Sequence, residues 1–400
     1  MYDTYIYDAV RTPIGLGQAD GALYEVKPID LLAALLYALE DRNKLPNKEV
    51  DDLIIGCVNP VDDQGSNLAK AALLYSKWDK GVSGFQINRE ECSGLEAINL
   101  AATKIKAGAN QLVIAGGLEC MSRVPRGKDR GPINYDSELL NVFDFVPSGI
   151  SADLLATLEG FDRQLLDQYT TISIEKAQAA QQKGYYKNYL IPFFDRNGLI
   201  VLGEDERLTN SPETSLEDLN PSFLELGQTG YDAIALHHHP ILEKIEHNHT
   251  LASTAQAADA AALLLLGNQD VGKALNLSPK AKIISTAVGG GSTSLRFGAL
   301  VEVIRKALKT AQLKFEDIHC WECSEDFAAI PLKLLKDLPI NKNSLNVNGG
   351  SLAWGHPLGA TGCIQMIHLL NELEQSGQEK GMVVTTSNSG MVVATIIERV

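Results

Sequence analysis

The sequence has little that would suit a nucleic-acid or membrane partner. It contains no run of basic residues, and its formal net charge at pH 7 is −15. A phosphate-rich polymer or an anionic membrane surface is therefore a poor partner for the chain as a whole. The longest apolar run, Ala257–Gly267, is interrupted by Asp259 and is too short to span a bilayer. The first residues have neither the basic nor the apolar region of a signal peptide, so a cytoplasmic location is expected.

Cysteine is also scarce, with six residues scattered through 400. This spacing indicates reduced thiols in a cytosol and not a disulfide framework. Cys320 and Cys323 form one close pair without a second, so they are expected at the end of a buried strand and not in a metal or redox site. The three histidines at 237–239 are followed by Pro240 and have no further ligands in sight, so no metal site is predicted.

The chain does contain a weak internal repeat that relates its two ends. Residues 30–58 and residues 299–323 each read as an amphipathic helix, an acidic turn and an apolar strand. Next come short strands that end in Asn88 and Asn348, each followed by a long helix and another strand. We expect these helices at 93–106 and 361–374, and these strands at 111–115 and 382–386. The alternation predicts two α/β halves with parallel sheets, stacked with helices between and outside them.

The middle of the chain, roughly residues 122–249, has irregular periodicity and many Pro, Asn, Asp, Tyr and His residues. We interpret this stretch as one large insertion that covers a site. The sequence then divides into an N-terminal half at 1–121, the insertion at 122–249, a return to the N-terminal half at 250–275 and a C-terminal half at 276–400.

Several motifs occur in a fixed order along the chain. The longest is NVNGGSLAWGHPLGATG, from Asn346 to Gly362, which contains His356. The others are AVRTP at residues 9–13, GCV at 56–58, AGGLE at 115–119 with MS at 121–122, and VATIIE at 393–398. Together these motifs resemble the thiolase family over essentially the whole chain. The insertion, with FVPSG at 145–149 and ADLLAT at 152–157, is most similar to 3-ketoacyl-CoA thiolases and acetyl-CoA acetyltransferases of the degradative type.

The resemblance implies a duplicated five-layer αβαβα architecture, an acyl-CoA ligand or substrate, no other cofactor, and a homodimer or homotetramer. In that family one cysteine at a helix N-terminus takes the acyl group, and a histidine activates it. A second cysteine moves a proton. The thioester oxygens sit in two oxyanion holes, one of which uses the histidine and a water held by an asparagine, whereas the other uses backbone N–H groups.

The family's nucleophile motif runs Asn, two residues, Cys, one residue, Ser-Gly-Leu, and here it reads NREECSGL from Asn88. Counting from Asn88 or from Gly94 places Glu91 at the nucleophile position, and Cys92 one residue later. One step along a helix turns a side chain by about 100° and moves it about 1.5 Å. Acyl transfer tolerates little misplacement, so Cys92 is expected to be a small buried residue.

Other family positions have changed as well. Thr386 stands at the second-cysteine position, and only Gly390 remains of the glycine run that follows it. Ser324 replaces the asparagine that holds the oxyanion water, although a serine can also bind a water. Near Ser253, the small polar contact to the CoA arm is replaced by Ala255. The Gly-Pro segment that opens the next helix reads SLRFG at 294–298, without the proline.

Three hypotheses follow. The first is an acyltransferase that still works through Cys92. The second is a silent homologue that binds an acyl-CoA or a partner, such as an active paralogue, with Glu91 and His356 forming a buried ion pair at a helix N-terminus. The third is carbanion chemistry on a CoA thioester in which Glu91 and His356 act as acid–base partners.

Overall fold

The computed structural model describes residues 2–143, 145–209 and 216–400. Its centre is a ten-stranded mixed sheet in the order β10-β11-β12-β9-β1-β8-β5-β3-β4, with β2 paired to β8. The strands of the first half are β1 (Tyr5–Arg11), β2 (Gly15–Leu16), β3 (Asp52–Gly56), β4 (Ser83–Ile87), β5 (Leu112–Cys120) and β8 (Ala258–Gly267). Those of the second half are β9 (Ala281–Gly290), β10 (Cys320–Cys323), β11 (Lys380–Thr386) and β12 (Met391–Arg399).

The two halves of the sheet meet at a short seam. Only two residue pairs join β1 to β9, namely Tyr5 with Lys282 and Ile6 with Ala281. On one side of the seam lie the strands from the first half of the chain, and on the other side lie those from the second half. The molecule therefore has two sheets that share an edge, in agreement with the predicted duplication.

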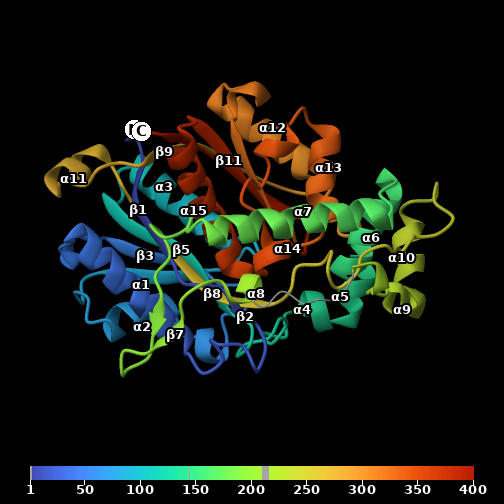
Figure 1. The fold of residues 1–400 in the computed structure, drawn as a ribbon, viewed down its shortest axis with the longest axis horizontal. Coiled ribbons are helices and arrows are strands. Elements are labelled where there is room, and N and C mark those ends of the chain that lie inside the picture. Colours follow the sequence, from blue (N-terminus) through green and yellow to red (C-terminus); the bar gives the residue numbers. More distant parts are fainter. Residues whose placement is uncertain (1, 144, 210–215) are drawn as a thin grey trace.

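Helices cover both sheets and fill the space between them. The middle layer is α3 and α15, which contact strands of both halves. Outside it, α1 and α2 cover the first sheet, and α12, with α13 beside it, covers the second (Figure 1). The helices of these layers are α1 (Pro28–Asn43), α2 (Leu68–Tyr75), α3 (Ser93–Lys106), α12 (Leu300–Ala311), α13 (Ala329–Asp337), α14 (Ser351–Trp354) and α15 (Leu358–Ser376). The predicted five-layer α/β architecture is confirmed.

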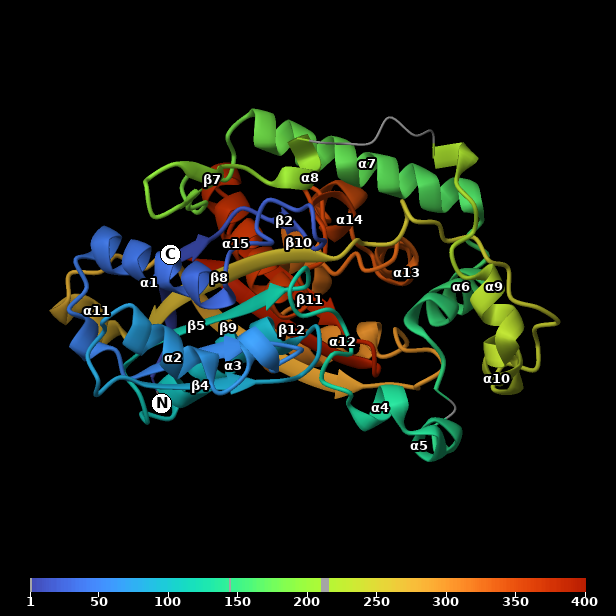
Figure 2. The same ribbon diagram turned by 90° about the horizontal axis from the view of Figure 1, so that it is seen from below.

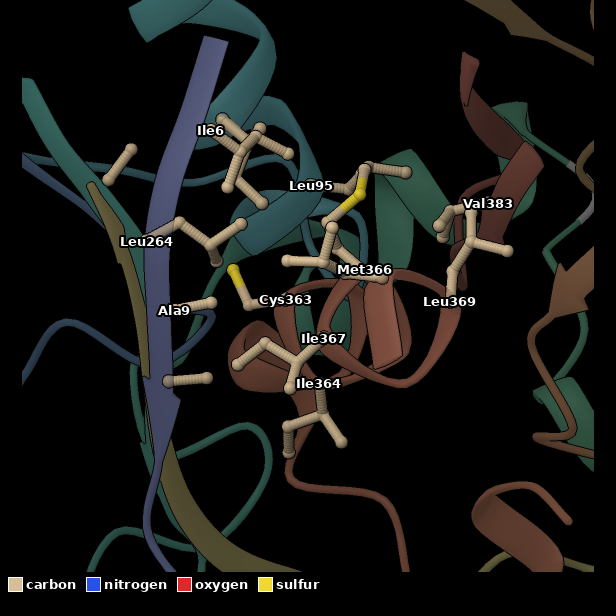
Figure 3. Packing of buried hydrophobic residues seen from close by; sticks show 14 of the residues in the cluster. Ile6, Ala9, Leu95, Leu264, Cys363, Ile364, Met366, Ile367, Leu369 and Val383 are labelled. Atoms are coloured by element: carbon tan, nitrogen blue, oxygen red, sulfur yellow. The ribbon is translucent and has the colours of Figure 1, made fainter. Parts of the chain in front are cut away.

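The middle layer is tightly packed because the sequence supplies small and apolar residues where the helices meet. Every residue of α15 from Leu358 to Leu373 is buried. A Cβ atom on Gly94 would lie 2.3 Å from the carbonyl oxygen of Gly359, so the N-termini of α3 and α15 approach closely only because glycine is present. Figure 3 shows Leu95 of α3 and Cys363 of α15 within this core.

Two details differ from the sequence-based expectation. The sheets are mixed and not parallel, since β8 runs antiparallel to β5 and β1, and β12 runs antiparallel to β11 and β9. The turn between β11 and β12 is too short for a crossover, which forces an antiparallel pair. The second short strand, expected to end at Asn348, is only a single bridge between Leu345 and Trp321. Asn346 takes a φ of 42°, which interrupts extended backbone.

The other repeat elements agree with the prediction. Helix α3 begins and ends where it was expected, at Ser93 and Lys106, and α15 extends the expected 361–374 helix at both ends. Strands β5 and β11 contain or closely match the expected segments. The cysteine pair lies in β10 and is buried, as predicted.

Between β5 and β8 the chain forms a mostly helical region. The long helix α7 runs along one side of the molecule, and α6, α9 and α10 lie near one of its ends (Figure 2). The elements of this region are α4 (Pro132–Tyr135), α5 (Ser137–Val142), α6 (Ser148–Glu159), α7 (Arg163–Gln182), β6 (Phe193–Phe194), β7 (Ile200–Leu202), α8 (Glu206–Thr209), α9 (Leu224–Leu226) and α10 (Asp232–His237), and α11 (Gln269–Ala274) follows β8. The exact domain division stays a prediction. No helix in the described ranges is long and apolar enough to cross a membrane.

Candidate active site

The turn between β4 and α3 carries the predicted nucleophile position. Glu90 has a φ of 49°, a left-handed conformation that side-chain-bearing residues seldom adopt. The turn is held by hydrogen bonds, because the Glu90 N–H donates to Asn88 Oδ1 (2.8 Å) and the Ser93 N–H donates to the Glu90 carbonyl (2.9 Å). This strained turn places Glu91 and Cys92 immediately before the first residue of α3.

The Glu91 carboxylate is buried, with 2% of its side chain exposed, and it is fully engaged. It accepts hydrogen bonds from the backbone N–H of Asn388 (2.9 Å), from Asn388 Nδ2 (2.5 Å) and from Arg126 Nη2 (2.5 Å). The Arg126 side chain keeps 42% of its surface exposed. Glu91 borders a cavity of about 130 Å³ whose polar lining includes Asn59, Asn88, Glu90, Arg126, Asp129 and Asn388.

Glu90, one residue before Glu91, also accepts hydrogen bonds from the turn that carries Asn388. Its Oε2 accepts hydrogen bonds from the backbone N–H (2.8 Å) and from Oγ (2.7 Å) of Ser389. Asn388 and Ser389 lie in the turn between β11 and β12, where the glycine run was expected. With glycine at both positions the two side-chain hydrogen bonds could not form. Side chains at these positions therefore join the two turns to each other.

Arg296 adds a second cation near these carboxylates. It is 1% exposed, and its guanidinium lies 4.3 Å from the centroid of the Phe145 ring and donates to the Val146 carbonyl. Burial lowers the pKa of Arg296 to about 10, although the charges of Glu91 and Glu90 act in the opposite direction. Arg296 therefore remains charged near neutral pH and helps to offset the negative charge of Glu90 and Glu91.

Cys92 is fully buried at the N-cap of α3. Its Sγ lies 3.5 Å from the Thr385 carbonyl oxygen and 3.8 Å from the Met391 carbonyl oxygen, and the thiol donates to these acceptors. Burial raises the pKa of the Cys92 thiol, and hydrogen bonding to Thr385 only partly opposes this shift. A neutral thiol without solvent contact is a poor nucleophile. Its position agrees with the expected role as a small buried residue.

His356 lies beside a carboxylate that the sequence analysis did not assign. Its Nδ1 is 2.8 Å from Thr361 Oγ1, and its Nε2 is 3.4 Å from Asp326 Oδ1. The other oxygen of Asp326 accepts a hydrogen bond from Thr386 Oγ1 (3.4 Å), and the Thr386 N–H donates to Ser324 Oγ (3.2 Å). The structure thus brings together three predicted site residues, His356, Thr386 and Ser324. Asp326, which was not predicted, lies between them.

The expected pair between Glu91 and His356 is wrong. No hydrogen bond or ion pair joins them among the residues that the structure describes, and His356 does not line the cavity beside Glu91. The physical reason is that each side chain has found a nearer partner. Asn388 and Arg126 hold the carboxylate, whereas the imidazole is hydrogen-bonded to Thr361 and faces Asp326.

The three residues predicted to contact CoA lie in two segments. The Ala328 N–H donates to the Ser253 carbonyl (3.0 Å), and the Ala255 N–H donates to the Asp326 carbonyl (2.9 Å), so this segment pairs with the one that carries Asp326. Gly390 has a φ of 80°, which glycine adopts without steric cost. A CoA-binding role for these residues stays a prediction.

A second buried charge cluster anchors the chain that leads to Ser253. Asp153 of α6 accepts hydrogen bonds from His247 Nδ1 (2.9 Å) and His249 Nδ1 (2.7 Å), and His247 Nε2 donates to Asp232 (3.0 Å). The hydrogen bond to Asp153 raises the pKa of His247 to about 9, against the effect of burial. Burial alone would raise the pKa of Asp153, but the two histidines outweigh it and lower that pKa.

Two family models match the chain. One describes the thiolase N-terminal domain and matches residues 4–231, and the other describes the thiolase C-terminal domain and matches residues 277–399. The chain belongs to the thiolase family.

Individual relatives agree with this assignment. The thiolase-family chain is 34% identical over 408 residues to a 3-ketoacyl-CoA thiolase from Marinobacter nauticus, and the match covers 100% of this chain and 98% of the relative. It is 32% identical over 411 residues to a 3-ketoacyl-CoA thiolase from Serratia proteamaculans, over 100% of both chains. Its structure resembles the crystal structure of the Bacillus anthracis acetyl-CoA acetyltransferase with a TM-score of 0.85, at 28% identity over 100% of this chain and 99% of the other.

Within this thiolase fold, three residues at the site were missed by sequence reasoning: Arg126, Asp326 and Arg296. A signal existed for Asp326, because it puts a carboxylate where the family string has alanine. Arg296 likewise gave a signal, because it lies in segment 294–298, which lacks the proline of the family string. Arg126 had no sequence signal, because its contact with Glu91 depends on how a loop folds back.

The thiolase-family chain has no obvious metal centre in the described part of the structure. There, no three His, Cys, Asp or Glu side chains gather in a way that could hold a metal ion. All six cysteines are buried free thiols. His237 ends α10, and its ring centroid lies 5.2 Å from that of His238.

Proposed function

We propose that this thiolase-family protein binds a CoA thioester without accepting the acyl group on a side chain. The ligand class follows from the relatives, which are named as a 3-ketoacyl-CoA thiolase and an acetyl-CoA acetyltransferase. The observation that carries the proposal is the environment of Glu91. Its carboxylate, which motif counting assigns to the nucleophile position, is held by three donors from Asn388 and Arg126.

Hydrogen bonds to all sides of a carboxylate lower its reactivity as a nucleophile, because they stabilise the ionised ground state. The backbone N–H of Asn388 is also a donor that could otherwise stabilise a thioester oxyanion. Glu91 occupies this donor itself. The protein therefore carries an anion of its own beside the place where acyl transfer would need one to develop.

The two remaining routes to acyl transfer have little support. A thiol as buried as that of Cys92 and with a raised pKa forms little thiolate near pH 7. Thr386 cannot replace a cysteine thiolate as a base, because its hydroxyl has no accessible anion at this pH. The carbanion route through Glu91 and His356 loses its basis as well, since the two side chains have different partners.

The test measures binding and acyl transfer separately. We expect calorimetry to detect binding of acetyl-CoA, while thiolysis of acetoacetyl-CoA stays at the level of a protein-free blank and an active thiolase serves as the positive control. Intact-mass analysis after incubation with acetyl-CoA should show an unmodified chain. An acetyl adduct on Cys92 or Glu91, or thiolysis that disappears in His356→Ala, would overturn the proposal.

We further propose that the protein assembles as a homo-oligomer. The support is the edge strand β4, which pairs only with β3 in the described part of the sheet, so that its outer edge has no strand partner there. Light scattering should give a multiple of the chain mass of 43.3 kDa. A monomer at micromolar concentration contradicts the idea, and a mixed oligomer after co-expression with an active paralogue would favour a subunit role instead.

A further inference from the structure

We propose that Asp326 and His356 form an acid–base pair that exchanges the α-hydrogen of a bound CoA thioester with solvent. The inference rests on the proposed thioester binding and adds an activity that needs no side-chain nucleophile. It also moves the acid–base role away from Glu91, which is held by other partners.

The imidazole is held in one orientation. Thr361 Oγ1, in the first turn of α15, lies 2.8 Å from Nδ1 of the ring. The backbone N–H of His356 donates to the Gln256 carbonyl (2.7 Å). Nε2 then faces Asp326 Oδ1 at 3.4 Å. Thr361 is therefore a positioning residue that leaves Nε2 directed toward the carboxylate.

Both facing atoms lack a hydrogen-bond partner in the described structure. His356 Nε2 and Asp326 Oδ1 are buried and unsatisfied, and their separation of 3.4 Å does not meet the geometry of a hydrogen bond. The two side chains keep 7% and 12% of their surface exposed, so solvent reaches part of each side chain. Unsatisfied buried polar atoms are costly and often mark a site that a ligand or water completes.

A third unsatisfied atom lies on the adjoining segment. Thr254 Oγ1 is buried without a partner, and Thr254 forms a bridge with Phe327, the residue after Asp326. The next residue, Ala255, donates its N–H to the Asp326 carbonyl (2.9 Å). This is also the segment in which the resemblance places the CoA arm. The polar atoms that need a partner thus adjoin the expected path of the thioester.

The proposed step conserves atoms and electrons. The α-carbon–hydrogen bond of the thioester breaks, and its proton passes to a basic atom of the Asp326–His356 pair, Oδ1 or Nε2. The electron pair moves onto the thioester oxygen as an enolate. The pair exchanges its proton with solvent and returns one to the carbon, so that no bond to CoA or to the acyl chain is broken.

The experiment incubates the full chain with acetyl-CoA in D₂O and follows deuterium in the acetyl group by mass spectrometry, while calorimetry measures binding of the same compound. We expect exchange above the rate in buffer. Asp326→Ala should lower that rate by about 100-fold or more, the range of general acid–base catalysis, with binding retained. Alanine suits this position because the family string has alanine there, so the fold should tolerate it.

Two further variants make the result specific. His356→Gln should lower exchange to a similar extent, and Asp232→Asn, which alters a carboxylate beside a different histidine, should leave it unchanged. Acetyl-CoA binding without exchange in the unaltered protein, or exchange that survives Asp326→Ala, overturns the acid–base pair alone. Absence of acetyl-CoA binding overturns the proposed ligand and this inference with it.

Discussion

The protein neutralises buried carboxylates in two regions, by different means. Around Asp153, the imidazole of His247 supplies the positive charge and His249 adds a second hydrogen bond, and their side chains are 4% and 0% exposed. Around Glu91, the cation is Arg126, whose side chain is 42% exposed. The core of the first cluster is enclosed, with only Asp232 at its edge 26% exposed, whereas the second opens to a small cavity.

The difference concerns what each cluster holds in place. Asp153 joins helix α6 to the chain that leads toward Ser253, so its ion pairs tie the helical region to the site. Glu91 joins two turns, and its arginine can exchange one partner for water. Removing one member of a buried ion pair strongly destabilises a protein, whereas a pair with an exposed member contributes little to stability. The comparison therefore predicts a hierarchy of stability effects.

The largest effect is expected for Asp153→Ala. This change leaves two buried histidines without their acceptor, and breaking a buried pair costs about 3–5 kcal/mol. Urea denaturation at neutral pH would measure the loss in the free energy of unfolding. A loss below about 1 kcal/mol would mean that the two clusters do not differ in the way proposed.

The next effect is a dependence on pH. The pKa of His247 is about 9 in the folded protein and about 6.5 in an unfolded chain. Its stabilising contribution is therefore complete below about pH 6.5 and is lost as the pH rises through 9. Allowing for solvent screening, we expect a loss of about 2 kcal/mol over this interval.

The matched control for this pH dependence is His247→Gln, which cannot titrate. Its unfolding free energy should fall less between pH 6.5 and 9 than that of the unaltered protein, measured in the same urea series. Equal slopes for the two proteins would assign the pH dependence to other groups.

A smaller effect is expected for Glu91→Gln. The two donors of Asn388 bond to different carboxylate oxygens, so the single amide oxygen can keep only one of these hydrogen bonds. Arg126 can turn to solvent, so the loss should be between about 1 and 2 kcal/mol. Thermal and urea unfolding would both report it. If the loss approached that of Asp153→Ala, the exposure of Arg126 would not be what distinguishes the two regions.

The smallest effect is expected for Ser389→Ala. Glu90 would lose the hydrogen bond from the hydroxyl but keep the one from the backbone N–H, so we expect a loss of about 0.5 kcal/mol. Urea denaturation of this variant beside Glu91→Gln would rank the two contacts between the altered turns. The order is contradicted if Ser389→Ala is the more damaging change.

Much of the fold could be predicted because it depends on local patterns. The apolar spacing of residues 93–106 is sufficient to define α3, and the apolar run that follows Asp259 in β8 indicates a strand buried on both faces. Strand direction could not be predicted in the same way. It depends on the short turn between β11 and β12 and on how β8 returns from the helical region, which alternation of helix and strand does not reveal.

The sequence predicted which residues belong to the candidate site, but not which residues they contact. Counting along motifs located Glu91, Thr386 and His356. Their partners come from segments far away in sequence, and the pairs depend on loop geometry. Asn388 was noted as a lost glycine, yet its role as a donor to Glu91 appears only when the two turns face each other.

The seam between the two sheets has a consequence for synthesis on the ribosome. Strand β1 lies between β8 and β9, and residues 258–267 and 281–290 are made long after residues 5–11. At roughly 5–20 residues per second, the wait for the first of these partners is on the order of ten seconds or more. During that time both edges of β1 lack the neighbours they have in the finished sheet. The nascent strand therefore waits without these partners for most of the time that synthesis of the 400 residues takes.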